Sequence, residues 1–337
     1  MNESPRRHQL NAIKLRALVR DHLGAPDSTM PRDVSSSGME PDGGGDFGGG
    51  AALLVDGVAW VLLDEQPARG LGAALAWALR RDAAALHVLA ERGTGLLARR
   101  AQGFGFPVSV WHVEGRALLP ALAEPLPVPS LLPAEHLALS SMIAEGGALP
   151  VVEHGVLAGE VDGLEVCRVV TDPYTDAVRL EVGVGAHDRE AFQMLHGDRP
   201  TAEALADVVR SVADHRRPGA RPHPLNLLAQ ERALRASLVA QPHLIGATEV
   251  TAVAPPVPRA NVKDAVPCVA TATIDGRPFA VVCSSGVDID VVPFAIDSRA
   301  ALGVPDCLVV LPVRDALDIQ RRLAAAATPP IAVVTVG

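Results

Sequence analysis

Two carboxylates near the C-terminus are the residues of this chain whose type and spacing best suit chemistry. Asp288 and Asp290 are separated by one residue and follow the apolar run 279–283. Carboxylate oxygens are the ligands that Mg²⁺ and Mn²⁺ bind in proteins, and a bound divalent ion can activate water for attack on a phosphoester. The pair therefore predicts a candidate catalytic and metal-binding site.

A third acid could join this pair from the helix predicted over residues 225–240. Glu231 lies four residues after Leu227 and three before Leu234, so it shares their apolar helix face. This placement makes Glu231 a candidate site residue. The alternative is structural, because Glu231 could pair with Arg235 one turn further on, on a partly solvated flank of the helix.

The acid pair also has a structural interpretation. A helix is predicted to begin near Pro293, and acids just before a helix satisfy its N–H groups and its dipole. The spacing of Asp288, Asp290 and Val292 resembles the DxDx(T/V) signature of haloacid-dehalogenase-like phosphotransferases. That resemblance implies a nucleophilic first Asp and a magnesium ion held by both acids. Residues 284–286 interrupt the strand that this signature should follow, which favours helix capping.

The glycine-rich segments and the search for catalytic motifs do not indicate nucleotide binding or a second catalytic site. Gly43, Gly45 and Gly48 satisfy the GxGxxG spacing, but they precede a strand instead of opening a helix after one. No glycine-rich loop carries a lysine, because Lys14 and Lys263 are the only lysines of the chain, and this excludes a Walker phosphate loop. No GxSxG or HExxH motif occurs. We expect no cofactor, and Mg²⁺ or Mn²⁺ only if the acids are catalytic.

Composition is typical of a globular protein with several cores. The chain has 337 residues, of which 48% are hydrophobic, enough for two or three domains. A net charge of −9 does not support a general nucleic-acid surface. The four cysteines show no zinc spacing, and we expect them to be buried thiols. Without a signal peptide or an apolar run of about 20 residues, we expect a cytoplasmic protein that meets no membrane.

The pattern of apolar runs and turns divides the chain into segments. Short apolar strands that alternate with helices predict an α/β fold of repeated mixed-sheet units with helices on both faces. The middle segment instead predicts α+β elements around a β-meander. The predicted segments are an N-terminal helix (1–24), a flexible Gly/Ser/Asp linker (25–50), an α/β unit (51–116), a proline-rich connector (117–133), a helix with a β-meander and further helices (134–218), and a C-terminal α/β domain (225–337).

The first and last α/β segments share an element order. Gly57 matches Gly276 with an offset of 219, and both glycines end an Asp-Gly hairpin turn. Later matched strands are offset by 221 and 223 residues. This pseudo-repeat predicts either the duplication of one unit or two units that obey common fold rules.

The order αβββαβ from residue 225 resembles the core of the restriction-endonuclease-like (PD-(D/E)XK) nucleases. In that family an acid and a (D/E)-x-Lys pair on adjacent strands hold a metal ion, and some members carry a helical glutamate where Glu231 lies. The third strand here reads VVCSS over 281–285, and neither lysine follows an acid by two residues. The resemblance covers 225–337 and implies a degenerate core without the catalytic motif.

Three stretches are similar to a family of proteins from GC-rich bacteria that has no assigned activity. These stretches are Arg179–Asp198, Glu231–Val239 and Val281–Leu302. The resemblance implies no activity. We therefore predict a non-catalytic binding or adaptor module with a protein partner, and the sequence leaves the oligomeric state open. The alternative is a metal-dependent phosphoesterase or nuclease-like enzyme that uses Asp288, Asp290 and Glu231.

Overall fold

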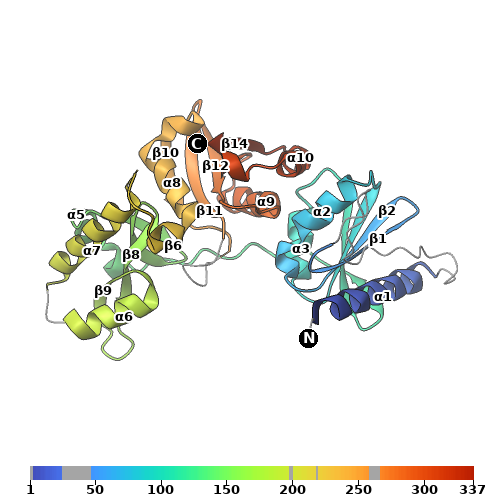
Figure 1. The fold of residues 1–337 in the computed structure, drawn as a ribbon, viewed down its shortest axis with the longest axis horizontal. Coiled ribbons are helices and arrows are strands. Elements are labelled where there is room, and N and C mark those ends of the chain that lie inside the picture. The colour runs from blue at the N-terminus through green and yellow to red at the C-terminus, as the bar shows by residue number, and fades with distance from the viewer. Residues whose placement is uncertain (1–2, 25–46, 197–199, 218, 258–265) are drawn as a thin grey trace. The chain divides into compact units, whose positions relative to one another are not determined.

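The chain divides into two compact units. The computed structural model describes residues 3–24, 47–196, 200–217, 219–257 and 266–337 (Figure 1). The first unit comprises Met1–Leu126, Asp288–Asp297 and Leu317–Ala332, and the second comprises Pro127–Val287, Ser298–Ala316 and Val333–Gly337. Most of the predicted linker 25–50 lies outside the described residues. Among the described helices, none has the length and apolar character needed to span a membrane.

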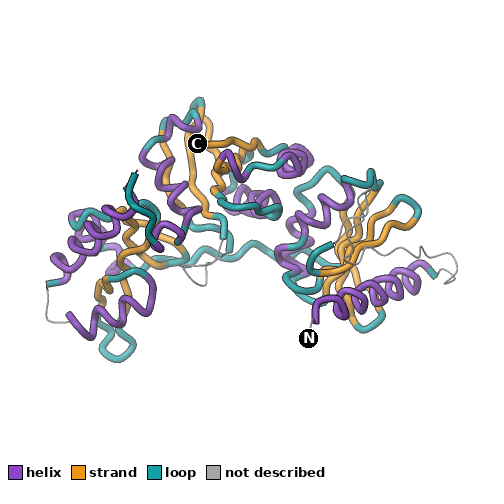
Figure 2. Tube along the Cα trace, in the orientation of Figure 1, coloured by secondary structure: helices purple, strands orange, loops and turns teal. Residues whose placement is uncertain are grey.

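A five-stranded sheet forms the centre of the first unit. Its strands lie in sequence order, and β2, β3 and β4 are parallel to one another, whereas β1 and β5 pair antiparallel at the two edges. The strands are β1 (Gly50–Val55), β2 (Val58–Leu63), β3 (Ala85–Ala90), β4 (Val108–Glu114) and β5 (Ala117–Pro120). The prediction of an irregular connector from 117 is wrong for β5, because the chain turns at Gly115 and pairs back onto β4. Residues 121–133 have no regular structure, as predicted (Figure 2).

Helices cover both faces of this sheet (Figure 1). Helix α1 (Glu3–Leu23) packs Leu15, Leu18 and Val19 against one face, where Trp60 and Leu62 of β2 point. The alternate residues of β2 face the opposite side, because successive side chains of a strand point to opposite faces. Helices α2 (Leu71–Leu79) and α3 (Thr94–Ala101), which connect the parallel strands, cover that side.

The second unit contains an antiparallel meander. Strands β6 (Leu149–Glu153), β7 (Val156–Val161), β8 (Leu164–Thr171) and β9 (Val178–Val182) lie in sequence order. One face packs against helices α5 (Ser140–Glu145) and α7 (Thr201–Arg216) through a core that includes Ile143, Leu164 and Leu205. The single helix predicted over 134–145 is two short helices, α4 (Ala134–Leu137) and α5. Helix α6 (Gly185–His196) follows β9.

The C-terminal elements follow the predicted order. Helix α8 (Gln230–Ala240) begins later than predicted, because a 3₁₀ turn (Pro224–Leu227) precedes it. The sheet then contains β10 (Glu249–Val253), β11 (Cys268–Ile274), β12 (Arg277–Cys283), β13 (Asp306–Pro312) and β14 (Ala332–Val336), with α9 (Val291–Leu302) and α10 (Asp318–Ala326) as connections. Strands β10, β11 and β12 are antiparallel, and β12 is parallel to β13. The predicted α/β class with repeated sheet units is confirmed.

The two Asp-Gly turns show why local sequence specifies the hairpins. Asp56 and Gly57 have φ values of 49° and 77°, and Asp275 and Gly276 have values of 49° and 73°. Positive φ at both central residues is the type I′ turn, whose twist matches that of the two strands it joins. Aspartate tolerates this conformation and glycine adopts it without strain, so each turn connects its hairpin with two residues.

Candidate functional site

The acids singled out by the sequence lie in different units. Asp288 and Asp290 belong to the first unit, and Glu231 belongs to the second. Within the ranges that the structure describes, no group of three His, Cys, Asp or Glu side chains could hold a metal ion. The metal-dependent interpretation of these acids stays a prediction.

Asp288 and Asp290 immediately precede helix α9, and each accepts hydrogen bonds. Asp288 accepts from the backbone N–H of Asp290 at 2.9 Å and from Arg69 at 3.0 Å. Asp290 accepts from the backbone N–H of Gly72, near the start of α2, at 2.9 Å. Burial raises the pKa of Asp290 to about 6; the Gly72 hydrogen bond opposes this rise, and the charge of Asp288 adds to it. The pair thus organises the start of α9 and its contact with α2.

Glu231 is buried on helix α8. Only 5% of the residue is exposed, so the predicted partly solvated flank is wrong. Ser285 Oγ donates to its carboxylate at 3.4 Å, and its backbone carbonyl accepts from the thiol of Cys268 at 3.0 Å. The guanidinium of Arg235, which the sequence places one turn further on, binds Glu153 and Glu160 of the meander.

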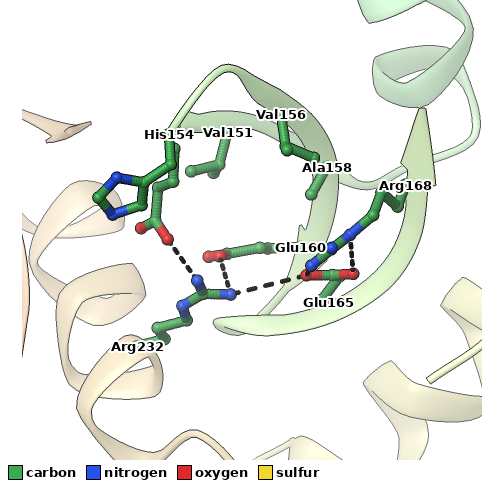
Figure 3. A pocket seen from close by; sticks show the side chains of 9 residues that line it. Val151, His154, Val156, Ala158, Glu160, Glu165, Arg168 and Arg232 are labelled. Carbon is green, nitrogen blue, oxygen red and sulfur yellow. Dashed lines mark hydrogen bonds and ion pairs between the residues drawn. The ribbon is translucent and has the colours of Figure 1, made fainter. Parts of the chain in front are cut away.

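A charged pocket lies on the other face of the meander (Figure 3). Its cavity has a volume of about 120 Å³. Charged side chains surround an apolar wall of valine and alanine in Figure 3. The lining residues are Val151, Glu153, His154, Val156, Ala158, Glu160, Glu165, Arg168 and Arg232. They come from β6, the β6–β7 turn, β7, β8 and α8, so four strand or turn segments and one helix build the pocket. We call it the meander pocket.

A β-bulge places two of the charged residues on the same face. The register of β7 and β8 shifts after the pair Glu160 and Glu165, which leaves Val166 without a partner. In a regular strand, residues three apart point to opposite faces, whereas a bulge inserts one residue and re-aims the side chains beyond it. Glu165 and Arg168 therefore share a face and form a bidentate pair, with two hydrogen bonds of 2.9 Å.

Arginines of α8 bind the glutamates from the helix side. Arg235, which is 1% exposed, donates to Glu153 at 2.6 Å and to both carboxylate oxygens of Glu160 at 3.1 and 3.2 Å. It also donates to the backbone carbonyl of Val269 on β11 at 3.3 Å. Arg232 binds Glu153 and lies 3.1 Å from Glu160 (Figure 3). This network joins α8 to the meander.

The arginines and the glutamates in this network are equal in number. Arg189 donates to Glu165 at 2.9 Å and lies 3.8 Å from Glu181. Four cations therefore contact four carboxylates, a balance of 4 − 4 = 0 for the cluster. The members are Glu153, Glu160, Glu165, Glu181, Arg168, Arg189, Arg232 and Arg235. A buried carboxylate held by cations is neutralised, so the pocket does not present three bare acids.

Burial and charge act in opposite directions on the central pair. Burial raises the pKa of Glu160, and the charges of Arg235 and Arg232 offset only part of this rise. Burial lowers the pKa of Arg235, but interactions with Cys268, Glu160 and Glu153 outweigh burial and raise it overall. Arg235 is consequently held in its charged form.

The turn at the mouth of the pocket carries a polar atom without a partner. His154 has a φ of 51° in the β6–β7 turn, a left-handed conformation. Its Nε2 atom is buried and makes no hydrogen bond to any described residue. Buried polar atoms are normally paired with protein, water or ligand, so this nitrogen is an unsatisfied polar atom beside the pocket. None of the nine lining residues is a serine, threonine or cysteine, so the pocket suits binding better than covalent catalysis.

Comparison with protein-family models, curated proteins and solved structures finds no match to the chain. The meander pocket is therefore interpreted from its own geometry.

The sequence analysis missed the meander pocket, although the sequence contains a signal for it. Glu160 and Glu165 interrupt otherwise apolar strands, and a charge inside an apolar strand requires a buried partner.

Proposed function

We propose that the chain is a non-catalytic binding or adaptor module whose meander pocket receives a carboxylate of a protein partner. The observation that supports this proposal is a hydrogen-bond donor that lines the pocket. Arg168 engages Glu165 through Nε and Nη2, and no described residue accepts from its Nη1.

Charge and size favour a carboxylate over other groups. The arginines already screen the three glutamates that line the pocket, so these acids do not repel an anion. A volume of about 120 Å³ holds a carboxylate with one or two methylene groups. Val151, Val156 and Ala158 offer apolar contact to those methylenes. The side chain of Asp or Glu, or a C-terminal carboxylate, meets these requirements.

An acetate titration followed by NMR tests the proposal. The probe is sodium acetate, with sodium chloride at equal ionic strength as the reference. The readout is the imidazole Hε1 signal of His154, identified by its loss in His154→Gln. We expect a saturable shift with acetate, no matching shift with chloride, and loss of the response in Arg168→Gln.

Arg210→Gln is the matched control for this titration. Arg210 lies on α7 of the same unit, and its side chain is 70% exposed. This variant should keep the acetate response of the wild type. An acetate response that chloride reproduces, or that survives in Arg168→Gln, would overturn the proposal. If acetate binds, acidic peptides follow as probes of the partner.

The proposed location is the cytoplasm. None of the four cysteines forms a disulfide, and all four are buried, as predicted. Reduced thiols suit a reducing compartment, which supports this part of the proposal.

A further inference from the structure

Two cysteines face each other across neighbouring strands of the second unit. Cys268 on β11 and Cys283 on β12 are direct partners in the antiparallel register. Both are buried, at 2% and 0% exposure, and their side chains interact with each other. Cys167 and Cys307 have no cysteine opposite them, because their strand partners are Gly159, Val182 and Ala280.

The hairpin register places the two cysteines at a distance that a disulfide can span. Ile274 and Arg277 flank the two-residue turn and form a hydrogen-bonded pair, and every second pair from there is of the same kind. Cys268 and Cys283 lie six pairs further on, so their Cα atoms are about 5.5 Å apart. Disulfides accept Cα separations of about 4.4–6.8 Å. Opposite Cβ atoms, however, lie about 4.5–5.5 Å apart, wider than the usual 3.8 Å.

We propose that Cys268 and Cys283 are a redox modification site that closes reversibly to a cross-strand disulfide. A strained disulfide is more easily reduced than a structural one, so the wide Cβ spacing favours reversibility. This inference is independent of the carboxylate pocket, because it requires only the thiol pair and a peroxide oxidant.

The surroundings assign different roles to the two sulfur atoms. The charged guanidinium of Arg235 lies near the sulfur of Cys268, and reactive cysteines sit beside such cations. The hydrogen bond with Cys268, together with burial, raises the pKa of Cys283. Cys283 thus remains a thiol. This suits the residue that later attacks the sulfenic acid formed on the other cysteine. Cys268 is the residue that is oxidised first.

Hydrogen peroxide is the oxidant class that fits a buried site, because it is close to water in size. The Cys268 thiolate attacks one peroxide oxygen, the O–O bond breaks, and a sulfenic acid and hydroxide form. The sulfur of Cys283 then attacks the sulfenic sulfur, the S–O bond breaks, and the S–S bond forms with release of water. The thiol proton of Cys283 and one further proton convert the two oxygens into water. Two electrons pass from the two sulfur atoms to the peroxide.

Disulfide closure has a consequence for helix α8. The thiol of Cys268 now donates to the carbonyl of Glu231, and its sulfur lies near Arg235, so two contacts hold β11 to α8. The disulfide removes the S–H donor and with it the hydrogen bond to the Glu231 carbonyl. We expect faster amide hydrogen exchange in α8 after oxidation.

Thiol counting and mass spectrometry of the full chain test the inference. Reduced protein is treated with peroxide, quenched with an alkylating agent in denaturant, and digested without reductant. We expect the count of alkylated thiols to fall from four to two, a peptide pair cross-linked through Cys268 and Cys283, and return to four thiols after treatment with glutathione.

Single serine variants separate this site from general oxidation. Cys283→Ser should trap Cys268 as a sulfenic acid that reacts with dimedone. Cys167→Ser and Cys307→Ser should keep the cross-link, because both residues lie outside the pair. Burial also raises the pKa of Cys167 and of Cys307 to about 12, so both should resist peroxide. A wild-type protein that keeps four thiols, or that cross-links through Cys167 or Cys307, would overturn the inference, and neither result depends on any variant folding.

Discussion

Phe104 and Ala327 form an antiparallel backbone bridge within the first unit. Phe104 follows helix α3, and Ala327 follows helix α10. Their numbers differ by 327 − 104 = 223, the same offset that relates the last strands of the two repeated segments. The bridge therefore joins two positions that correspond to each other in the pseudo-repeat.

The hydrogen bonds on either side of this bridge are reciprocal. Gly105 N–H donates to the Ala326 carbonyl at 3.0 Å, and Thr328 N–H donates to the Gly103 carbonyl at 2.8 Å. Such a reciprocal pair of hydrogen bonds occurs at an antiparallel bridge. The duplication of one unit and the alternative of common fold rules both stay predictions.

Replacing Arg235 by Met should destabilise the second unit strongly. Arg235 is buried and holds Glu153 and Glu160, and its removal leaves both carboxylates with fewer cations in a low-dielectric site. Breaking a buried ion pair typically costs about 3–5 kcal/mol. Amide exchange of β7 peptides measures the free energy of opening. Arg210→Met is the control, since that exposed side chain pairs only at the surface and should change the value by about 1 kcal/mol or less. Equal effects of the two variants would contradict the assignment of a buried network.

Asp290 should make the first unit less stable as the pH rises. Its pKa is raised from 3.8 to about 6 in the folded chain, so the folded state binds its proton more tightly than the unfolded state does. The resulting stabilisation is complete below about pH 4 and is lost as the pH rises through 6, and two pKa units correspond to about 3 kcal/mol.

Tryptophan fluorescence measures this effect selectively. Trp60, Trp77 and Trp111 are the three tryptophans of the chain, and all belong to the first unit. Urea unfolding at pH 4.5 and pH 7 should show that wild type loses stability relative to Asp290→Asn as the pH rises. Carboxylates of lowered pKa, such as Asp64, also make stability depend on pH. Their contribution is the same in both proteins, so it cancels in the difference between them. A pH-independent difference between them would rule out the raised pKa.

Gly72→Ala should destabilise the first unit although alanine is the better helix former. A Cβ atom at Gly72 would collide with the backbone carbonyl of Ile289, and the Gly72 N–H donates to Asp290. Helix propensity alone would stabilise by about 1 kcal/mol, whereas forced separation of packed backbones costs about 1–3 kcal/mol. Urea unfolding followed by tryptophan fluorescence gives the sign. Gly48→Ala, where an added Cβ meets no atom, should be nearly neutral.

His87 should remain neutral to a lower pH than an ordinary histidine. Trp111 Nε1 donates to its Nδ1 at 2.7 Å, and Trp60 stacks on its ring at a centroid distance of 4.0 Å. Burial lowers the pKa of His87 from 6.5, and the nearby His22 adds to this effect. Because the folded state binds this proton less tightly, stability should fall as the pH drops below 6.5.

NMR titration of the imidazole signals checks this prediction. The His87 signal, assigned by its loss in His87→Phe, should have a midpoint below 6.5. The tryptophan fluorescence of the wild type should change at the same midpoint, because a protonated Nδ1 cannot accept from Trp111. A fluorescence step that persists in His87→Phe would assign the change to another group.

Sequence alone predicted most of the fold because its signals are local. The Asp-Gly turns, the apolar strands and the alternation of strands with helices each depend on a few neighbouring residues. The cysteines were predicted to be buried because they lie within apolar strands. Errors arose where a long-range contact decided the outcome. Strand β5 forms because it pairs with β4. The break between α4 and α5 contains no glycine, so the local sequence does not indicate it.

The candidate site was decided by tertiary structure. Glu153 and Arg235 are 82 positions apart, and Glu160 and Arg235 are 75 apart. Their contact depends on the register of the meander, and the bulge at Val166 that aligns Glu165 with Arg168 is a property of paired strands. The sequence determined the elements, because backbone preference and apolar periodicity act over short range. Only the packed structure decided which charges meet. Burying an unpaired charge is costly, so each buried charge pairs with an opposite charge that the fold brings close, however distant in sequence.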